Sequence, residues 1–469
     1  MNVDVVIIGG GIAGLATAYE LSRCGASFIV LERASRVGGV ILSEHIDGYT
    51  IDGGPDALLV QKPEGIRLCE EIGLGDHLVS TQPPRVAYVQ RGARLHPLPA
   101  ASVLGIPTRI APFARTRLFT WRGKLRMAAE LFVPARRDEA DESIGAFMTR
   151  RFGREAAMYL AEPLLAGIHA GDVDRLSVRA LFPRLVEAER KYGSVLRAFR
   201  HQRTPNPERG TPNPAADGAF KSLPGGLSEM VDALVRAIGD AHIRTNADVM
   251  LVRRASSHGF VVNTASGESL HARAVVLATP AYVTSSLVKG MDDDLSRACG
   301  EVRYASAATV ALAFQRAAVA HPLNGSGFVV PRVEGTGLLA ASWLSSKWPH
   351  RAPDGRVLLR TFVGGARDPQ ALDRSDAELV TLSMTALRAL LGIRGEPLFT
   401  RVYRWPRANA QHEVGHLDRL AGIERALARH PGLFVTGSGF RGVGIPDCVA
   451  DGRATAKQVA AWLPESVPN

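Results

Sequence analysis

The chain has few cysteines and no cysteine cluster. Its 469 residues contain only Cys24, Cys69, Cys299 and Cys448, and no two of them form a C-x-x-C pair. This spacing argues against a zinc site and against a dithiol redox motif, and it is typical of a reducing compartment. We therefore expect a cytoplasmic protein without a metal centre.

Long apolar runs are also missing. No stretch of about 18 uninterrupted apolar residues occurs, so a membrane-spanning helix is not expected. Residues 1–4 carry no basic group and lead directly into an apolar run, which argues against a signal peptide. With 46% apolar and 22% charged residues, the composition is that of a globular protein of two or three domains.

Acidic residues are absent between Asp76 and Glu130, where nine Lys or Arg residues occur in a chain of formal charge +10. Such a stretch attracts an anion: a polycarboxylate substrate, anionic lipid headgroups or nucleic acid. A solvated basic face is the alternative. Since no nucleic-acid-binding motif accompanies the charge, we expect no nucleic-acid partner.

The same region holds Phe113, Leu118, Phe119, Trp121, Leu131 and Phe132. These side chains would either dock on a bilayer or line a substrate pocket.

The first forty residues contain a dinucleotide-binding pattern. An apolar run at 5–8 leads into the G-x-G-x-x-G turn at 9–14, which opens a helical pattern. A second apolar run ends at Glu32, 18 positions after Gly14. Strand, glycine turn, helix, strand and acid predict a βαβ unit whose helix N-terminus faces phosphates, although a glycine turn of another α/β fold is the alternative. The expected contacts are Gly9, Gly11, Ile12, Ala13, Gly14, Glu32 and Arg33.

A second glycine pair follows six residues after Glu32, and a further glycine pair lies at 53–54. This arrangement resembles the extended FAD motif of flavoproteins of the glutathione-reductase and amine-oxidase type. The resemblance implies one non-covalent FAD per chain. Those proteins usually carry Arg after the second pair, whereas Val40 stands here, so a charge contact from that position is lost. The expected contacts are Gly38, Gly39, Val40, Gly54, Pro55 and Asp56.

The remaining sequence alternates between helical and strand patterns. Helical periodicity predicts helices at 121–132, 143–151, 155–165, 181–200, 227–238 and 447–463. Strand patterns predict a hairpin at 85–97 and strands at 248–252, 274–280 and 432–438. A stretch rich in Pro and Asn predicts a mobile loop at 203–218.

FAD-domain sequence thus occurs in three separated pieces, which resembles the topology of para-hydroxybenzoate hydroxylase and the amine oxidases. We expect an α/β fold with a discontinuous, Rossmann-like FAD domain, a mixed-sheet substrate domain and a mainly helical domain that faces substrate or membrane. The expected ranges are 1–85, 220–289 and 412–469 for the FAD domain, 86–104 and 290–411 for the substrate domain, and 105–219 for the helical domain.

The C-terminal block at 437–448, Gly-Ser-Gly-Phe-Arg-Gly-Val-Gly-Ile-Pro-Asp-Cys, resembles the flavin motif of the oxygen-dependent protoporphyrinogen and coproporphyrinogen oxidases. Blocks at 96–99, 105–108, 162–172 and 414–416 stand in the order of that family, so the likeness covers nearly the whole chain. It implies FAD-dependent, six-electron oxidation of a porphyrinogen to a porphyrin in haem biosynthesis, with O2 as acceptor and H2O2 released. Another amine oxidase, a carotenoid desaturase, and a binding protein without redox chemistry are the alternatives.

The same resemblance implies substrate-site residues. Gly167 matches a position where the macrocycle approaches closely, although a helix-ending glycine is the alternative. Arg85 matches an arginine that pairs with a propionate, and Lys62 is a second cation. His169 stands where an aromatic residue is usual and is a candidate proton acceptor, or else a packed histidine.

Further flavin contacts are expected from distant parts of the chain. The helix at 447–463 should point its N-terminus at the flavin, because its N–H groups and dipole favour the negative charge of reduced flavin. Trp405 would flank the isoalloxazine, unless it is a core residue. The expected contacts are Val443, Gly444 and Ile445 at the flavin, Val249 at the adenine, and Trp405.

The substrate stays open between two porphyrinogens. Arg85 is similar to the protoporphyrinogen type, whereas Lys62 and the block at 105–108 are similar to the coproporphyrinogen enzymes of Gram-positive bacteria. The family resemblance also implies docking on the inner face of the cell membrane, and hand-off of the product to a chelatase or another haem-pathway enzyme.

Overall fold

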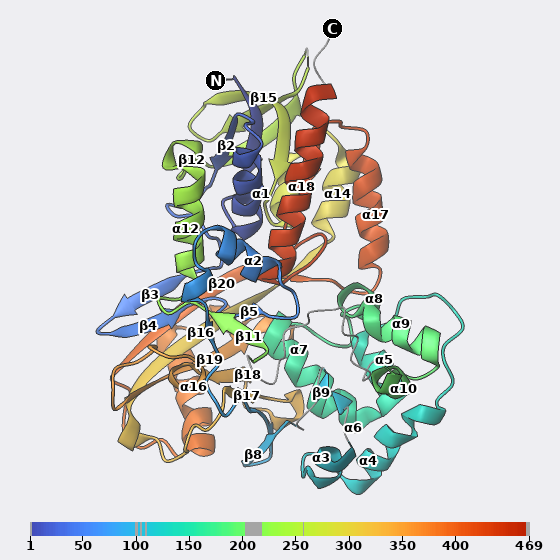
Figure 1. Ribbon diagram of the computed structural model, residues 1–469, viewed down its shortest axis with the longest axis vertical. Helices are drawn as coiled ribbons and strands as arrows, with labels where there is room; N and C mark the ends of the chain where they lie inside the picture. Colours follow the sequence, from blue (N-terminus) through green and yellow to red (C-terminus); the bar gives the residue numbers. More distant parts are fainter. Residues whose placement is uncertain are drawn as a thin grey trace.

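The computed structural model describes residues 2–98, 102–103, 106–107, 110–201, 218–256 and 258–465. The loop expected at 203–218 lies outside these residues except for Gly218, as do Gly105 and Thr108 of the block at 105–108. Figure 1 shows three parts: a sheet with long helices at the top, a second sheet at the lower left, and a group of helices at the lower right.

The upper part contains a seven-stranded sheet of order β12-β2-β1-β15-β14-β13, with β21 beside β15. Its strands are β1 (Asn2–Ile8), β2 (Phe28–Leu31), β12 (Ile243–Arg244), β13 (Val249–Arg254), β14 (Phe260–Thr264), β15 (Ser269–Leu277) and β21 (Leu433–Val435). The strands β12, β2, β1, β15 and β21 run parallel. Three separated stretches therefore build one sheet, which confirms the discontinuous Rossmann-like fold.

Helices cover both faces of this sheet. The helices are α1 (Ile12–Arg23), α2 (Glu64–Glu71), α12 (Ser228–Ile238), α13 (Ala281–Leu287), α14 (Asp293–Gly300), α17 (His416–Leu427) and α18 (Ile445–Glu465). One face packs against α1, α2, α12 and α18 through buried side chains such as Val5 and Ile7. The other face packs against α13, α14 and α17 through Val6 and Ile8. The central strands are apolar throughout because both faces are buried.

The second sheet has the order β20-β16-β19-β18-β17-β7-β8. Its strands are β7 (Ala87–Arg91), β8 (Arg94–Pro97), β16 (Arg303–Gln315), β17 (Gly327–Val329), β18 (Leu338–Trp343), β19 (Arg356–Gly364) and β20 (Phe399–Gln411). The antiparallel pair β7 and β8 confirms the expected hairpin. Helix α16 (Asp376–Leu391) packs its buried leucines on one face, and short α15 (Leu344–Lys347) precedes β19.

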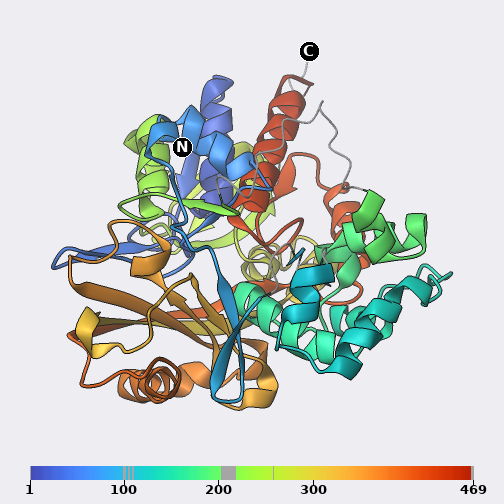
Figure 2. The same ribbon diagram turned by 60° about the horizontal axis from the view of Figure 1, so that its bottom comes forward.

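The helical part lies beside the second sheet in both views (Figures 1 and 2). Its helices are α3 (Ile110–Arg115), α4 (Trp121–Ala128), α5 (Ile144–Phe152), α6 (Arg154–Ala156), α7 (Glu162–His169), α8 (Val178–Leu181), α9 (Pro183–Tyr192) and α10 (Val195–His201). The expectation of one helix over 181–200 was wrong. Pro183 starts α9, and Gly193, in a left-handed conformation with φ of 69°, ends it, so proline and glycine divide the segment.

Short strands outside the two large sheets form smaller sheets. They are β3 (Ser43–Ile46), β4 (Tyr49–Asp52), β5 (Leu58–Leu59), β6 (Val79–Ser80), β9 (Ser102–Val103), β10 (Ile106–Pro107) and β11 (Phe220–Ser222). Strand β11 lies between β5 and β6, where the chain returns from the helical part to the first sheet. The exact domain boundaries given above stay a prediction.

Candidate functional site

The glycine turn at 9–14 leaves an open space at the start of α1. A Cβ atom at Gly14 would lie 2.0 Å from the carbonyl oxygen of Gly9, so helix and strand approach as closely as the spacing predicts. A Cβ atom at Gly11 would meet no atom within 4 Å, although this residue is half-buried. No side chain caps α1 at Gly11, so the N–H groups of Ile12 and Ala13 in its first turn are available for phosphate.

The second glycine pair lies against the first. The amide of Gly38 donates to the carbonyl oxygen of Gly10 at 2.8 Å, and a Cβ atom at Gly39 would lie 3.4 Å from the Cα of Gly11. Val40, which follows the pair, is 40% exposed. Two backbone turns without side chains thus border the same space, which fits a diphosphate.

Arg36 is a residue that the sequence reasoning missed. Its guanidinium donates to the carbonyl oxygens of Val37 at 3.1 Å, Ile41 at 3.0 Å and Gly39 at 2.7 Å. Arg36 therefore fixes the glycine-pair turn from behind. An arginine before the pair, where Val40 leaves none after it, was a signal available in the sequence.

The carboxylate of Glu32 lies at the end of β2. Its Oε2 accepts from the amide of Gly10 at 2.7 Å and its Oε1 from the amide of Ala34 at 2.8 Å. The amide of Ala247 donates to the Glu32 carbonyl at 2.9 Å, which brings the start of β13 and buried Val249 to this end of the sheet. Arg33 is exposed. Each Glu32 oxygen retains a lone pair for a ribose hydroxyl.

The segment at 52–56 is held by the second sheet. Arg360 of β19 donates to the carbonyl oxygen of Gly54 and to Oδ1 of Asp56, both at 2.7 Å. The other oxygen of Asp56 accepts from Lys347 Nζ and Trp348 Nε1, each at 2.7 Å. Burial alone would raise the pKa of Asp56, but Lys347 and Arg360 outweigh it and hold the pKa far below its usual range. The side chain of Asp56 is thus directed into this buried network.

Trp405 and Gly54 are neighbours beside this network of Asp56. The indole Nε1 of Trp405 donates to the carbonyl oxygen of Gly53 at 2.9 Å. A Cβ atom at Gly54 would lie 1.9 Å from the carbonyl oxygen of Val40, so only glycine fits there, with Pro55 following it. Tyr403, two residues before Trp405 on β20, packs its ring on Gly53 and bonds to Glu44 through its hydroxyl.

The C-terminal turn lies beside the start of α1. A Cβ atom at Gly437 would lie 3.7 Å from the Cβ of Ala13. Asp451, which the sequence reasoning missed, accepts from the amide of Gly437 at 3.0 Å and from Thr436 Oγ1 at 2.8 Å. Helix α18 packs so closely on α1 that a Cβ atom at Gly452 would lie 2.4 Å from the Ala13 carbonyl oxygen.

The first residues of α18 project past the start of α1. Ile445 precedes Gly452 by seven residues, or about 10 Å of helix at 1.5 Å per residue. Val443, Gly444 and Ile445 are half-buried or exposed. The loop at 443–445 is thus at least partly accessible beyond the start of α1.

Lys62 and Asp447 meet at the start of α18. The Nζ of Lys62 lies 2.7 Å from both carboxylate oxygens of Asp447. His169, at the end of α7, is near this pair: burial first, and then the charge of Lys62, lower its pKa to about 4, against an opposing effect of Asp447. His169 is consequently neutral at neutral pH.

Two further histidines, His412 and His416, lie near His169. The rings of His412 and His416 stack with centroids 3.7 Å apart and planes inclined by 10°. Their Nε2 atoms lie 2.9 Å from the carbonyl oxygen of Ser438 and 2.8 Å from that of Phe440, so each N–H holds one carbonyl of the C-terminal turn. Burial, followed by the neighbouring His416, lowers the pKa of His412 to about 3.

Gly167 lies in α7, and Arg85 lies just before β7. A Cβ atom at Gly167 would lie 3.3 Å from Val329 and 3.5 Å from Ala340, so α7 uses this glycine to approach β17 and β18. Arg85 is exposed, and its Nε donates to the carbonyl oxygen of Thr81 at 2.9 Å. The role of each toward a substrate stays a prediction.

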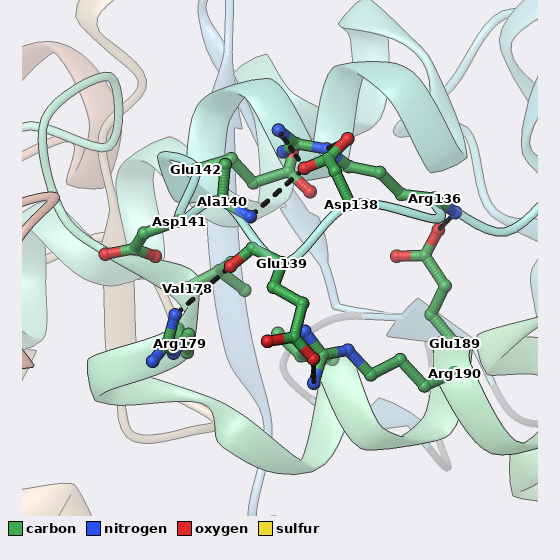
Figure 3. Close-up of a pocket in the computed structure, with 11 residues that line it drawn as sticks. Arg136, Asp138, Glu139, Ala140, Asp141, Glu142, Val178, Arg179, Glu189 and Arg190 are labelled. Carbon is green, nitrogen blue, oxygen red and sulfur yellow. Dashed lines mark hydrogen bonds and ion pairs between the residues drawn. The ribbon is translucent and has the colours of Figure 1, made fainter.

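A separate charged pocket lies in the helical part (Figure 3). It has a volume of about 30 Å³. Its arginines bind groups of its own wall: Arg136 pairs with Asp138 at 2.7 Å, and Arg179 donates to the carbonyl oxygen of Glu139 at 3.2 Å. These contacts hold the 136–142 segment in place, and the pocket shares no lining residue with the glycine turns.

Comparisons with known proteins agree with this geometry. A family model described as flavin-containing amine oxidoreductase matches residues 12–460. The coproporphyrinogen III oxidase of Bacillus subtilis (strain 168) is 34% identical over 466 residues, 98% of this chain and 98% of that protein. The chloroplastic protoporphyrinogen oxidase of Nicotiana tabacum is 28% identical over 98% of this chain and 86% of that protein.

Solved structures give the same result. A protein from Exiguobacterium sp. 255-15, provisionally assigned as a protoporphyrinogen oxidase, superposes with a TM-score of 0.86 at 31% identity, over 98% of both chains. Cyclohexylamine oxidase from Brevibacterium oxydans IH-35A superposes with a TM-score of 0.72 at 17% identity, over 99% of this chain and 100% of that one. This second likeness extends to the fold alone.

Proposed function

Because the chain belongs to the flavin-containing amine oxidoreductases, and among them to the family of coproporphyrinogen III and protoporphyrinogen oxidases, we propose that it is an FAD-dependent porphyrinogen oxidase of haem biosynthesis. The observation that carries the proposal is the 34% identity to the Bacillus subtilis coproporphyrinogen III oxidase over nearly the full length of both proteins. The bare glycine turns at the start of α1 support it, because they fit the cofactor.

One FAD per chain would be held without a covalent bond. The N–H groups at Gly11, Ile12 and Ala13 would bind its diphosphate, and Glu32 would accept from the ribose. The remaining contacts would come from the glycine pair at 38–39, the segment at 54–56, Val249, Trp405 and the loop at 443–445. Cys448 offers no covalent attachment, because its sulfur is buried and burial raises the pKa of its thiol to about 12.

The bound flavin supplies the two-electron acceptor for each of the three oxidation rounds, and O2 would reoxidise it with release of H2O2. The protein chain must orient the macrocycle and accept the protons that leave it. His169 is neutral at neutral pH and can receive a proton. Its pKa of about 4 makes it a weak base, since a general base works best with a pKa near the operating pH.

Cations must recognise the carboxylates of the substrate. Coproporphyrinogen III carries four propionates and protoporphyrinogen IX two, so cation placement would separate them. Arg85 presents a guanidinium that can bind a carboxylate with two hydrogen bonds. Lys62 lies near His169 but is already paired with Asp447, so a propionate there would have to compete with that carboxylate.

An amine oxidase is the less favoured function. Such an enzyme would need aromatic side chains to cage an amine, and Tyr403 with Trp405 would have to supply them. Both side chains are engaged: Trp405 donates to Gly53, and Tyr403 packs on Gly53 and bonds to Glu44. Their rings thus brace the backbone beside the flavin space.

A membrane surface and a downstream haem-pathway enzyme, such as a chelatase, are the proposed partners. No helix among the described residues is long and apolar enough to cross a bilayer. An exposed apolar patch on the helical part, formed by Trp121, Leu125 and Phe132, would instead let this protein dock on the inner face of the cell membrane with its basic stretch at 85–126 beside the headgroups.

The test is purification followed by a comparison of two substrates. We expect a yellow protein whose kcat/KM can be measured for coproporphyrinogen III and for protoporphyrinogen IX, with O2 consumption and H2O2 release in step with porphyrin fluorescence. The substrate with the higher kcat/KM is the physiological one. A colourless protein that does not take up FAD, or a yellow protein inactive on both porphyrinogens, would refute the proposal.

A further inference from the structure

The ion pair of Lys62 and Asp447 joins two segments that are 385 positions apart in the chain. Lys62 belongs to the turn after β5, and Asp447 to the first turn of α18. The Lys62 Nζ lies 2.7 Å from both carboxylate oxygens, although the two side chains are 51% and 26% exposed. The pair therefore ties the turn after β5 to the first turn of α18.

Asp447 lies at the point where α18 would face the flavin. Its Oδ2 also accepts from the amide of Gly444 at 3.2 Å, so the carboxylate occupies the end of the loop at 443–445. A carboxylate in a first helical turn interacts favourably with the positive helix end. The same carboxylate would repel the negative charge that a reduced flavin develops at that end.

We propose that Lys62 is a positioning residue that neutralises Asp447, so that the N-terminus of α18 can favour the reduced flavin. The inference rests on the proposed flavin site. It gives Lys62 a function through Asp447 rather than through a substrate propionate. The charges of Lys62 and Asp447 both act on the pKa of His169, so the ion pair lies close to the end of α7.

The experiment measures the flavin midpoint potential of the purified holoenzyme without substrate. Lys62→Met leaves Asp447 uncompensated and should weaken binding of reduced relative to oxidised flavin about two- to tenfold, a lowering of roughly 10–30 mV for a two-electron couple. Asp447→Asn leaves Lys62 uncompensated and should raise the potential by a similar amount. The double variant should return close to the wild-type value.

Two controls accompany these variants. Arg67→Met removes an ion pair of similar exposure, Arg67 with Glu64 at 2.9 Å, and should leave the potential unchanged. Lys62→Arg keeps the positive charge and should retain the wild-type potential. If Lys62→Met does not retain flavin, the sign of the shift in Asp447→Asn decides.

Three results would overturn the inference. The first is potentials of both single variants equal to the wild-type value, and the second is shifts of the same sign. The third is a raised KM in Lys62→Met while the midpoint potential of that same single variant equals the wild-type value, which would make Lys62 a substrate clamp. A colourless wild-type protein would instead refute the flavin site itself, so the two failures are distinguishable.

Discussion

At the scale of single residues, Gly11 is a position where an added methyl group should weaken cofactor binding without affecting folding. Its Cβ would meet no protein atom, so Gly11→Ala should leave the melting temperature of the flavin-free protein within about 2 °C, since a side chain that touches nothing changes stability little. We expect FAD affinity to fall by at least about tenfold, because the methyl would occupy the space of the diphosphate. Flavin fluorescence titration measures the affinity.

The control for Gly11→Ala is Gly14→Ala. There the Cβ would lie 2.0 Å from the Gly9 carbonyl oxygen, so this variant should lose stability even without flavin. Unchanged FAD affinity in Gly11→Ala would show that the cofactor does not pass this residue.

Arg85 allows a second residue-scale prediction. If its guanidinium binds a propionate, Arg85→Ala should raise KM about tenfold or more, with little change in kcat or in the flavin spectrum, because a charged hydrogen bond to substrate is lost. Steady-state kinetics with both porphyrinogens provide the measurement. Arg94→Ala, an exposed arginine of the adjacent β8, is the control, and an equal KM in the two variants would remove the clamp role.

At the scale of secondary-structure elements, α4 and the residues after it form the exposed apolar patch of the helical part. Trp121 and Leu125 are four residues apart on one helix face and are 71% and 68% exposed, and Phe132 is 82% exposed. Of the apolar residues singled out in this region, Leu118 and Phe119 are buried in the core instead. The exposed apolar residues of this region are thus fewer than the sequence pattern predicts, and their side chains are mostly accessible.

We expect this patch to bind anionic membranes. Replacement of Trp121, Leu125 and Phe132 by Ser should lower flotation with anionic liposomes on the order of tenfold, because each side chain contributes buried apolar area at the interface. Serine substitutions at Met250, Val333 and Leu398, which are exposed on other parts, are the matched control. Failure of the wild-type protein to float at low and high salt would reject docking.

Elements formed by local patterns could be predicted, whereas contacts between distant elements could not. The βαβ unit at the N-terminus follows from glycine and apolar spacing within thirty residues. By contrast, Arg360 binds Asp56 across 304 positions, and Lys62 binds Asp447 across 385. The sequence around each of these residues gives no sign of its distant partner. The end of α9 at Gly193 could have been predicted, since glycine commonly ends helices. The helical periodicity on both sides of Gly193 nevertheless favoured one continuous helix.

At the scale of the whole molecule, the stacked pair His412 and His416 connects the second sheet and α17 with the C-terminal turn of the first. The pKa of His412 is about 3 in the fold, below the ordinary value near 6.5. Between these values the unfolded chain binds more protons. The contribution of His412 to the free energy of unfolding is therefore fully present above about pH 6.5. It is lost as the pH falls toward 3, by up to about 1.4 kcal/mol per pH unit.

This linkage predicts the behaviour of His412→Gln. The variant cannot titrate, so its urea midpoint should fall less steeply than that of the wild-type protein between pH 6.5 and 4. His77→Gln, at an exposed position, should keep the wild-type slope. Parallel curves for the wild-type protein and His412→Gln would contradict the assignment.

The packing of α18 on α1 has a consequence for synthesis of the protein. Part of the surface that covers α1 at Ala13 comes from Gly452, which is translated 439 residues later. At about 5–20 residues per second, the apolar side of α1 is exposed for roughly 20 to 90 seconds before the residues of α18 that pack on it are synthesised. The packing of α1 in the cofactor domain is consequently completed only after Gly452 has been translated, and chaperones have that interval in which to bind.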